Sequence, residues 1–159
     1  MSISDHIVVM RAGVLQQSGK PQAVYDDPVN LFCAKFLGTP PINVFRGTVK
    51  SGALYLGGAA VLSVPGVRDG EVTVGIRPEG FVLDENGAFV CGKRSVEVMG
   101  RDVSVVAAHP AIESESGTLR AIIPSDSAVA GDTVRFTLKP HKVHLFDPAS
   151  GERIRFAEG

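Results

Sequence analysis

The pattern of apolar and polar residues changes at Pro40-Pro41. Residues 5–18 predict two short strands around a Gly turn, and residues 19–38 predict two short helices, each opened by a proline. After the two prolines, short runs rich in Val, Ile, Phe and Tyr alternate with turn residues. This second pattern predicts strands at 42–50, 53–57, 60–64, 71–77, 88–98, 102–108, 118–123, 133–138, 142–146 and 152–156.

The first forty residues carry several local signals. Ile7 to Met10 form a continuous apolar run, which is typical of a strand buried on both faces. Pro21 suits the first position of a helix, where its missing N–H would be unpaired in any case. Asp27 and Pro28 stop that helix and can cap the next one, which Gly38 ends. The second helix is expected to present an apolar stripe made of Phe32, Phe36 and Leu37.

This pattern predicts one incomplete domain followed by one complete domain. A hairpin and two short helices are too small to bury a core of their own. We therefore interpret residues 1–40 as the remnant of a larger α/β domain, and residues 41–159 as a complete β domain. Residues 1–38 are expected to expose apolar surface or to pair with another molecule, because their packing partner would be missing.

The β domain is predicted to be a small barrel or sandwich, because it has many short strands at close, regular spacing. The clearest local unit is a hairpin. Val96 and Val98, then Val103 and Val105, alternate with polar neighbours on either side of a turn at Gly100. The fold class expected for the whole chain is mainly β, with a short α/β stub in front.

Charge and composition narrow the range of partners. The net charge of −1 gives no electrostatic case for nucleic acid or an anionic membrane. Aromatic residues make up only 6% and Trp is absent, which argues against the stacking surface that single-strand binding requires. Cys33 and Cys91 sit in apolar runs, which predicts buried free thiols and suits a reducing cytoplasm. No stretch is long enough to cross a bilayer, and the N-terminus lacks the basic start of a signal peptide.

Three motifs that invite a chemical interpretation do not support one. The segment Gly13 to Pro21 has one residue too many for a phosphate-binding loop, and Pro21 replaces the hydroxyl residue that would hold Mg²⁺. His141 and His144 would point to opposite faces of a strand, which is wrong for a shared metal. Glu113 and Glu115 lie in a Ser- and Gly-rich loop, where nothing would desolvate them for acid–base catalysis.

The segment Arg77-Pro78-Glu79 is the candidate contact site. It directly follows a predicted strand, and Pro78 ends the ladder because it has no N–H. Arg77 and Glu79 flank the proline and can form a charge-assisted bond. Two interpretations stay open. The ion pair stabilises only its own turn, as most ion pairs at turns do, or the motif makes a regulatory or partner contact.

Four stretches together resemble one family, the ATP-binding subunits of ABC importers of the maltose and glycerol-3-phosphate type. The stretch from Asp5 to Phe45, with its GxxxQxG-type turn and its D-P-x-x-x-F-x-A-x-F-x-G run, is similar to the end of the family's nucleotide-binding domain. GIRPEG matches the family's Arg-Pro-Glu motif, and VEVMGRDVSVVA resembles its V-E-x-x-G hairpin. KPHKVHLFDPASGERI resembles its closing segment.

The resemblance implies a fold and a role. It implies that residues from about 42 onward form a regulatory domain of the TOBE type, with OB-fold-like barrel character. It also implies a homodimer formed through this domain, a transmembrane permease as partner, and a cytoplasmic position at the inner face of the membrane. ATP and Mg²⁺ are the cofactors implied for the full-length protein, and none is expected in this region.

The family's catalytic motifs are not found in the sequence: no P-loop, LSGGQ signature, acidic Walker B strand or switch histidine is present. In the family the switch histidine lies just before a Glu-Ala-Met run, and Met1 can be that methionine. We therefore expect no ATP hydrolysis by these 159 residues. The alternative function is a small oxyanion-binding TOBE module, in which the backbone N–H groups of Gly57-Gly58 would cradle the anion.

Overall fold

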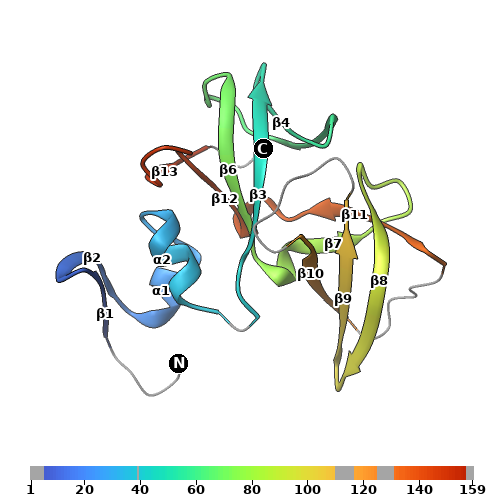
Figure 1. Cartoon of the computed structure of the whole chain (residues 1–159), viewed down its shortest axis with the longest axis horizontal. Helices are drawn as coiled ribbons and strands as arrows, with labels where there is room; N and C mark the ends of the chain where they lie inside the picture. The colour runs from blue at the N-terminus through green and yellow to red at the C-terminus, as the bar shows by residue number, and fades with distance from the viewer. Residues whose placement is uncertain (1–5, 39, 110–116, 125–130, 157–159) are drawn as a thin grey trace.

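The computed structural model describes residues 6–38, 40–109, 117–124 and 131–156. Asp5, Met1, Glu113 and Glu115 lie outside these residues. The described chain is mainly β, and its few helices are short, as predicted (Figure 1). Its elements are β1 (Ile7–Arg11), β2 (Val14–Gly19), α1 (Pro21–Asp26), α2 (Leu31–Phe36), β3 (Asn43–Lys50), β4 (Ala53–Leu56), β5 (Ala59–Ser63), β6 (Gly70–Ile76), η1 (Pro78–Gly80), β7 (Phe81–Leu83), β8 (Phe89–Met99), β9 (Asp102–Ala108), β10 (Leu119–Pro124), β11 (Thr133–Leu138), η2 (Pro140–Lys142), β12 (Val143–Phe146) and β13 (Arg153–Ile154).

Two antiparallel sheets form the body of the protein. The first has the strand order β13-β12-β6-β3-β4-β5, and the second has the order β10-β9-β8-β11-β7. The edge strands β7 and β10 of the second sheet approach each other, so this sheet is nearly closed into a barrel. The OB-fold-like fold class expected from the sequence is thus confirmed. The hairpin predicted around Gly100 is also confirmed, with Val96 opposite Val105 and Val98 opposite Val103.

The largest hydrophobic core lies between these two sheets and draws residues from both. Phe81, Phe89 and Phe136 form a chain of ring contacts at its centre, with centroids 5.9 Å and 5.2 Å apart. Asn43 joins the sheets by polar contacts: its side-chain amide donates to the carbonyls of Ile76 and Arg120, and its side-chain oxygen accepts from the Arg120 N–H. The two sheets therefore behave as one body.

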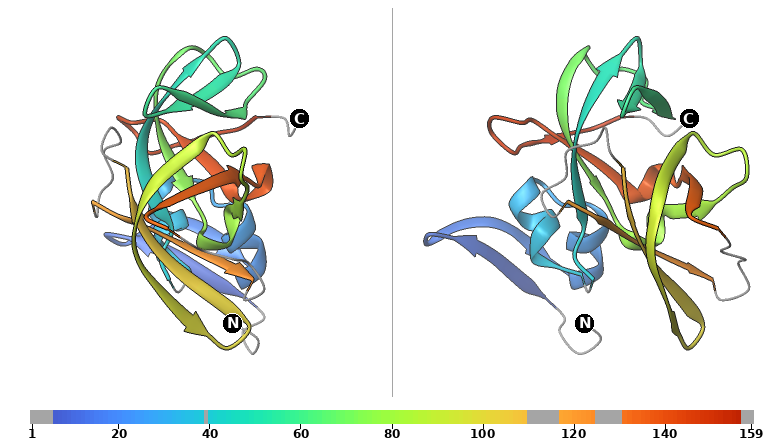
Figure 2. Two further views of the ribbon diagram at one scale, coloured as in Figure 1. Left: turned by 90° about the vertical axis from the view of Figure 1, so that its right-hand side faces the viewer. Right: turned by 45° about the vertical axis from the view of Figure 1, so that its right-hand side comes forward.

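The N-terminal segment, residues 6–38, lies to one side of this body (Figures 1 and 2). Val9, Val24 and Cys33 form a small cluster that joins the hairpin β1–β2 to the two helices. A second cluster of Ala34, Ile42, Val44 and Phe146, with Leu31 against it, seats α2 on the body. The segment is thus attached through α2, and the hairpin projects away from the body (Figure 2).

Exposed apolar surface was expected in this segment and is found there. Val8 and Met10 are each 51% exposed, so the prediction that Ile7 to Met10 is buried on both faces is wrong. Only Val9 of this strand is buried, because a two-stranded hairpin covers one face and leaves the other open. The other exposed large apolar residues of the segment are Val14, Leu15, Val29 and Phe36.

The second helix also departs from the prediction. It is capped by Asn30, whose side-chain oxygen accepts from the Cys33 N–H at 2.9 Å, and no proline opens it. The predicted apolar stripe is confirmed only in part: Phe32 and Leu37 pack against the cluster of Val9, Val24 and Cys33, whereas Phe36 is 54% exposed. The fully buried residues of the helix are Cys33 and Ala34. The first helix does begin at Pro21 as predicted.

Candidate functional site: the Arg-Pro-Glu turn and its seam

Arg77 sits where β6 ends and the short η1 turn begins, and it is the largest of the most deeply buried side chains. Its guanidinium group points out of its own turn and into the N-terminal segment. Nη1 donates to the carbonyl oxygens of Ala34 at 2.8 Å and Leu37 at 3.0 Å. Nη2 donates to the carbonyl oxygen of Tyr25 at 2.8 Å. One arginine thus satisfies carbonyls from the end of α1 and the end of α2, which have no partner within their own helices.

Tyr25 and Glu79 complete this cluster. The Arg77 guanidinium carbon lies 4.0 Å from the centroid of the Tyr25 ring, which is a cation–π contact. The Tyr25 hydroxyl donates to Glu79 Oε2 at 2.5 Å, and Lys142 Nζ lies 3.3 Å from the same oxygen. Among the described residues, Arg77 and Glu79 do not bond to each other. Both instead contact Tyr25 of α1.

Burial and charge act in opposite directions on these groups. Desolvation lowers the pKa of Arg77, and the nearby Tyr25 and Glu79 oppose that change. Desolvation also pushes the pKa of Glu79 upward, but hydrogen bonds from Tyr25 and Lys142 outweigh it, so the pKa of Glu79 is lowered overall. The pKa of Tyr25 is raised, first by burial and then by its hydrogen bond to Glu79. At neutral pH the cluster therefore holds a cation, a neutral phenol and a carboxylate.

The contacts of Arg77, Glu79 and Lys142 with the N-terminal segment form a polar seam between the segment and the body. Backbone contacts extend this seam toward the C-terminal strands. The Leu31 N–H donates to the Gly151 carbonyl at 2.9 Å, and the Arg153 N–H donates to the Val29 carbonyl at 3.2 Å. Asn30 and Glu152 form an isolated antiparallel bridge between these two bonds. The chain between α1 and α2 therefore pairs with the last strand region of the body, although the two are far apart in the sequence.

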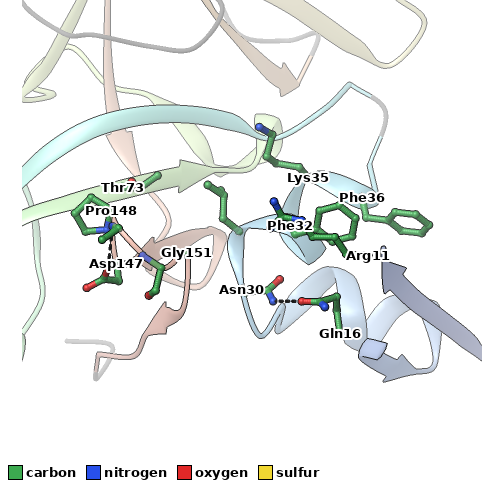
Figure 3. Close-up of a pocket in the computed structure, with 13 residues that line it drawn as sticks. Arg11, Gln16, Asn30, Phe32, Lys35, Phe36, Thr73, Asp147, Pro148 and Gly151 are labelled. Carbon is green, nitrogen blue, oxygen red and sulfur yellow. Dashed lines mark hydrogen bonds between the residues drawn. The ribbon is translucent and has the colours of Figure 1, made fainter. Parts of the chain in front are cut away.

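A groove of about 740 Å³ lies between the hairpin, α2 and the loop from Asp147 to Gly151 (Figure 3). On one side, the Asn30 amide donates to Gln16 Oε1 at 2.9 Å, and the Arg11 guanidinium lies 5.4 Å from the centroid of Phe32. On the other side, Asp147 accepts backbone N–H bonds within its own loop. The groove therefore separates the hairpin from the loop 147–151 of the body.

The remaining sequence candidates have structural roles. Cys33 and Cys91 are buried free thiols as predicted, and burial raises the pKa of Cys91 to about 12. His141 lies in the η2 turn, so placing it on a strand was wrong, while His144 is buried in β12. Among the described residues, no three His, Cys, Asp or Glu side chains gather to hold a metal ion. No helix within the described ranges is long and apolar enough to span a membrane.

Gly57 and Gly58 form the two-residue turn between β4 and β5. Both have positive φ, +62° and +85°, which is the backbone that a type I′ hairpin turn needs. Their conformation is thus explained by the hairpin itself.

Relatives of this chain are transport proteins. No protein-family model matches it. An sn-glycerol-3-phosphate import ATP-binding protein of Paracoccus denitrificans (strain Pd 1222) is 35% identical over 157 residues, which are 97% of this chain and 44% of the relative. One from Jannaschia sp. (strain CCS1) is 34% identical over 158 residues, 97% of this chain and 43% of the relative. An alpha-glucoside transport ATP-binding protein of Rhizobium meliloti (strain 1021) is 36% identical over 167 residues, and the match covers 98% of this chain and 45% of the relative.

These matches confirm the resemblance found in the motifs. Over nearly its whole length the chain resembles the ATP-binding subunits of sugar-type ABC importers, and the partial coverage of these relatives is consistent with a C-terminal region of such a subunit. It spans less than half the length of these relatives.

Sequence reasoning singled out Arg77, Pro78 and Glu79 but missed their partners. Tyr25 and Lys142 are 52 and 63 residues away from the motif residues that they contact, and no local pattern links them. The apolar and aromatic content of the helical segment was the available signal that this segment packs against something, but it does not specify the partner residues.

Proposed function

We propose that this chain is the C-terminal regulatory and dimerisation region of the ATP-binding subunit of an ABC importer for a sugar or a polyol phosphate. ATP and Mg²⁺ are handled by the rest of the subunit, and a transmembrane permease is its partner. The region lies at the cytoplasmic face of the membrane and pairs with a second copy through its β domain. Residues 1–40 belong to the nucleotide-binding part, and residues 41–159 form the TOBE-type regulatory domain.

The observation that carries this proposal is the contact made by Arg77. A side chain of the β domain, 1% exposed, holds three carbonyls of the segment that precedes it. A buried guanidinium with three acceptors fixes both distance and direction, because its donors are planar. A movement of the nucleotide-binding part is therefore transmitted to the β domain as a rigid displacement. This is the regulatory contact that we assign to Arg77, Pro78 and Glu79.

The open face of the hairpin fits the same proposal. Val8, Met10, Val14 and Leu15 are each at least half exposed, and they lie on two neighbouring strands. Leu15 is directly opposite Met10, and Val8 lies two residues before Met10, so these three exposed side chains share one face of the hairpin. Such a patch on so small a sheet marks a surface that another part of the protein covers. We assign it to the nucleotide-binding part of the subunit.

A chimera tests the proposal. The region of the Paracoccus denitrificans relative that this chain matches is replaced by the chain, and the chimera is reconstituted with that relative's permease. We expect ATP-dependent uptake that exceeds the uptake by the truncated relative. The variant Arg77→Ala in the chimera is expected to keep its folded β domain but lose much of the uptake per ATP hydrolysed. A chimera no better than the truncated relative contradicts the proposal.

Two simpler measurements separate its parts. The 159-residue chain alone is expected to show no ATP turnover. In sedimentation equilibrium it is expected to dimerise. ATP turnover by the chain alone would overturn the division of roles, whereas a monomer at high concentration would overturn only the assignment of the dimer to the β domain.

A further inference from the structure

A second cleft, of about 570 Å³, lies on the seam between the end of α1 and the C-terminal part of the body. Its wall combines residues of α1, η2, β12 and the strand region around β13. The cationic side chains in the wall are Lys142, Arg153 and Arg155, and the acidic ones are Asp26 and Asp27. His141 and His144 also line it. The motif cluster described above uses Lys142 but leaves the rest of this cleft unexplained.

The two arginines converge on a single carboxylate oxygen. Asp27 Oδ1 lies 3.0 Å from Arg153 Nη1 and 2.6 Å from Arg155 Nη1. Arg153 and Arg155 are two residues apart on an extended chain, which places their side chains on the same face. Two guanidinium groups that share one carboxylate oxygen form a cationic pair suited to an oxyanion, because each guanidinium has five N–H donors. Arg153 Nη1 also donates to the Pro28 carbonyl at 2.8 Å.

Two buried nitrogen atoms of this wall lack partners. Arg153 Nε and His144 Nδ1 are buried, and neither has a hydrogen-bond partner within the described part of the chain. His144 is 2% exposed, so its unpaired nitrogen is a costly group to bury. Both residues line the cleft that holds the paired arginines, so this polar region carries hydrogen-bonding capacity that the described residues leave unused.

Cationic side chains outnumber acidic ones in the wall of the cleft, three to two. The pKa of His144 is lowered to about 3, first by burial and then by Arg153, Arg77 and Lys142, while Asp27 opposes them. His144 is therefore neutral at physiological pH. Asp27 is 58% exposed at its side chain and can leave the arginines without unpacking a core.

We propose that this cleft binds a dianionic phosphate group, which takes the place of the Asp27 carboxylate on Arg153 and Arg155. Lys142 and His141 also line this cleft. Because Asp27 follows directly on α1, exchange of the carboxylate for the ligand loosens one of the ties between the N-terminal segment and the body. The inference stands apart from the proposed transport function, since it concerns binding by this chain alone.

Calorimetric titration of the full chain tests it, at constant ionic strength. The probes are inorganic phosphate, sn-glycerol 3-phosphate and, as the uncharged control, glycerol. Saturable binding of both phosphates supports the proposal. Binding of inorganic phosphate alone supports it and limits the cleft to the free anion. A response to phosphate no larger than the response to added chloride overturns it.

Two variants make the test specific to this cleft. Arg155→Gln is expected to weaken phosphate binding about tenfold, because one charge-assisted contact is lost. Arg155 is 59% exposed, so this variant keeps its fold. Arg101→Gln, which changes an exposed arginine in the β8–β9 turn, is the matched control and is expected to bind like the parent chain.

Asp27→Asn distinguishes ligand exchange from a purely structural salt bridge. Removal of the competing carboxylate is expected to tighten phosphate binding severalfold. A structural bridge without a ligand predicts lower stability and no binding. Unchanged affinity in both Arg155→Gln and Asp27→Asn would overturn the proposal.

Discussion

The β body and the N-terminal segment are held together by different kinds of interaction. In the body, two sheets bury one continuous core in which residues such as Val105 and Phe136 are fully inaccessible. In the segment, the clusters contain few residues, and large apolar side chains such as Met10 remain open to solvent. The segment is fixed instead by a polar seam centred on Arg77. We therefore expect the body to keep its fold by itself and the segment to depend on its attachment.

The largest expected effect comes from the core of the body. Phe136→Ala removes a fully buried ring that contacts Phe81, and we expect a loss of about 3–5 kcal/mol in the free energy of unfolding. Because the segment rests on the body, both should unfold together. Urea denaturation followed by circular dichroism measures this loss. A loss below about 1 kcal/mol would show that this ring does not hold the two sheets together.

Removal of the central side chain of the seam should have the next largest effect. Arg77→Ala leaves the carbonyls of Tyr25, Ala34 and Leu37 without their donor, and we expect a loss of about 2–4 kcal/mol. The loss should appear as early melting of the segment, with the body intact. Urea melts in a Tyr55→Phe background, where Tyr25 of α1 is the remaining tyrosine, separate the two transitions when Tyr fluorescence and the far-ultraviolet signal are both followed. Arg101→Ala is the matched control and should leave both unchanged.

His144 provides a pH-dependent test inside the body. Its pKa falls from the ordinary 6.5 to about 3 on folding, so the folded state binds fewer protons than the unfolded state between these values. Its contribution is fully present above pH 6.5 and is lost as the pH falls toward 3. The slope should approach about 1.4 kcal/mol per pH unit. Urea melts from pH 7 to pH 4 should show a shallower dependence in His144→Phe; equal slopes would refute this assignment.

The hydroxyl of Tyr25 tests the outer part of the seam. Tyr25→Phe keeps the ring against Arg77 but removes the hydrogen bond to Glu79. We expect a loss of about 1 kcal/mol, since one hydrogen bond to a charged acceptor disappears at a half-buried site. The same variant should raise the pKa of Glu79 toward its ordinary value, because a bond that lowers it is gone. Nuclear magnetic resonance titration of the Glu79 carboxyl carbon measures that change, and an unchanged pKa would contradict it.

The smallest effect on stability is expected at the open face of the hairpin. Leu15→Ser changes a side chain that is 58% exposed, so the free energy of unfolding should move by no more than about 0.5 kcal/mol. Solubility should rise, because the apolar patch is interrupted. Light scattering against concentration compares the variant with the parent chain. A large loss of stability would mean that Leu15 packs against the body.

How far the sequence predicts this structure depends on the range of the interaction. The hairpin around Gly100 follows from alternating valines, and Pro21 correctly opens the first helix, because both are local effects. The cap at Asn30 was missed, since Asp27-Pro28 offers a competing signal two residues earlier. Strand β7, with only three residues, gave too short a pattern to recognise.

The candidate site shows the same limit. Arg77, Pro78 and Glu79 stand out in the sequence because a proline directly after a strand ends its ladder. Their contacts with Tyr25 and Lys142 depend on how the N-terminal segment folds back onto the body, and a sequence pattern does not encode that path. The convergence of Arg153 and Arg155 on Asp27, across 126 and 128 residues, was hidden for the same reason.

Hydrogen exchange most directly tests whether Arg77 attaches the N-terminal segment to the body. In the parent chain, amides of α1 and α2 should be protected nearly as well as those of β12, while amides at the outer end of the hairpin β1–β2 exchange faster. In Arg77→Ala, protection of α1 and α2 should fall to the level of the hairpin, with β8 and β9 unchanged. Helices that keep their full protection in this variant would contradict the account.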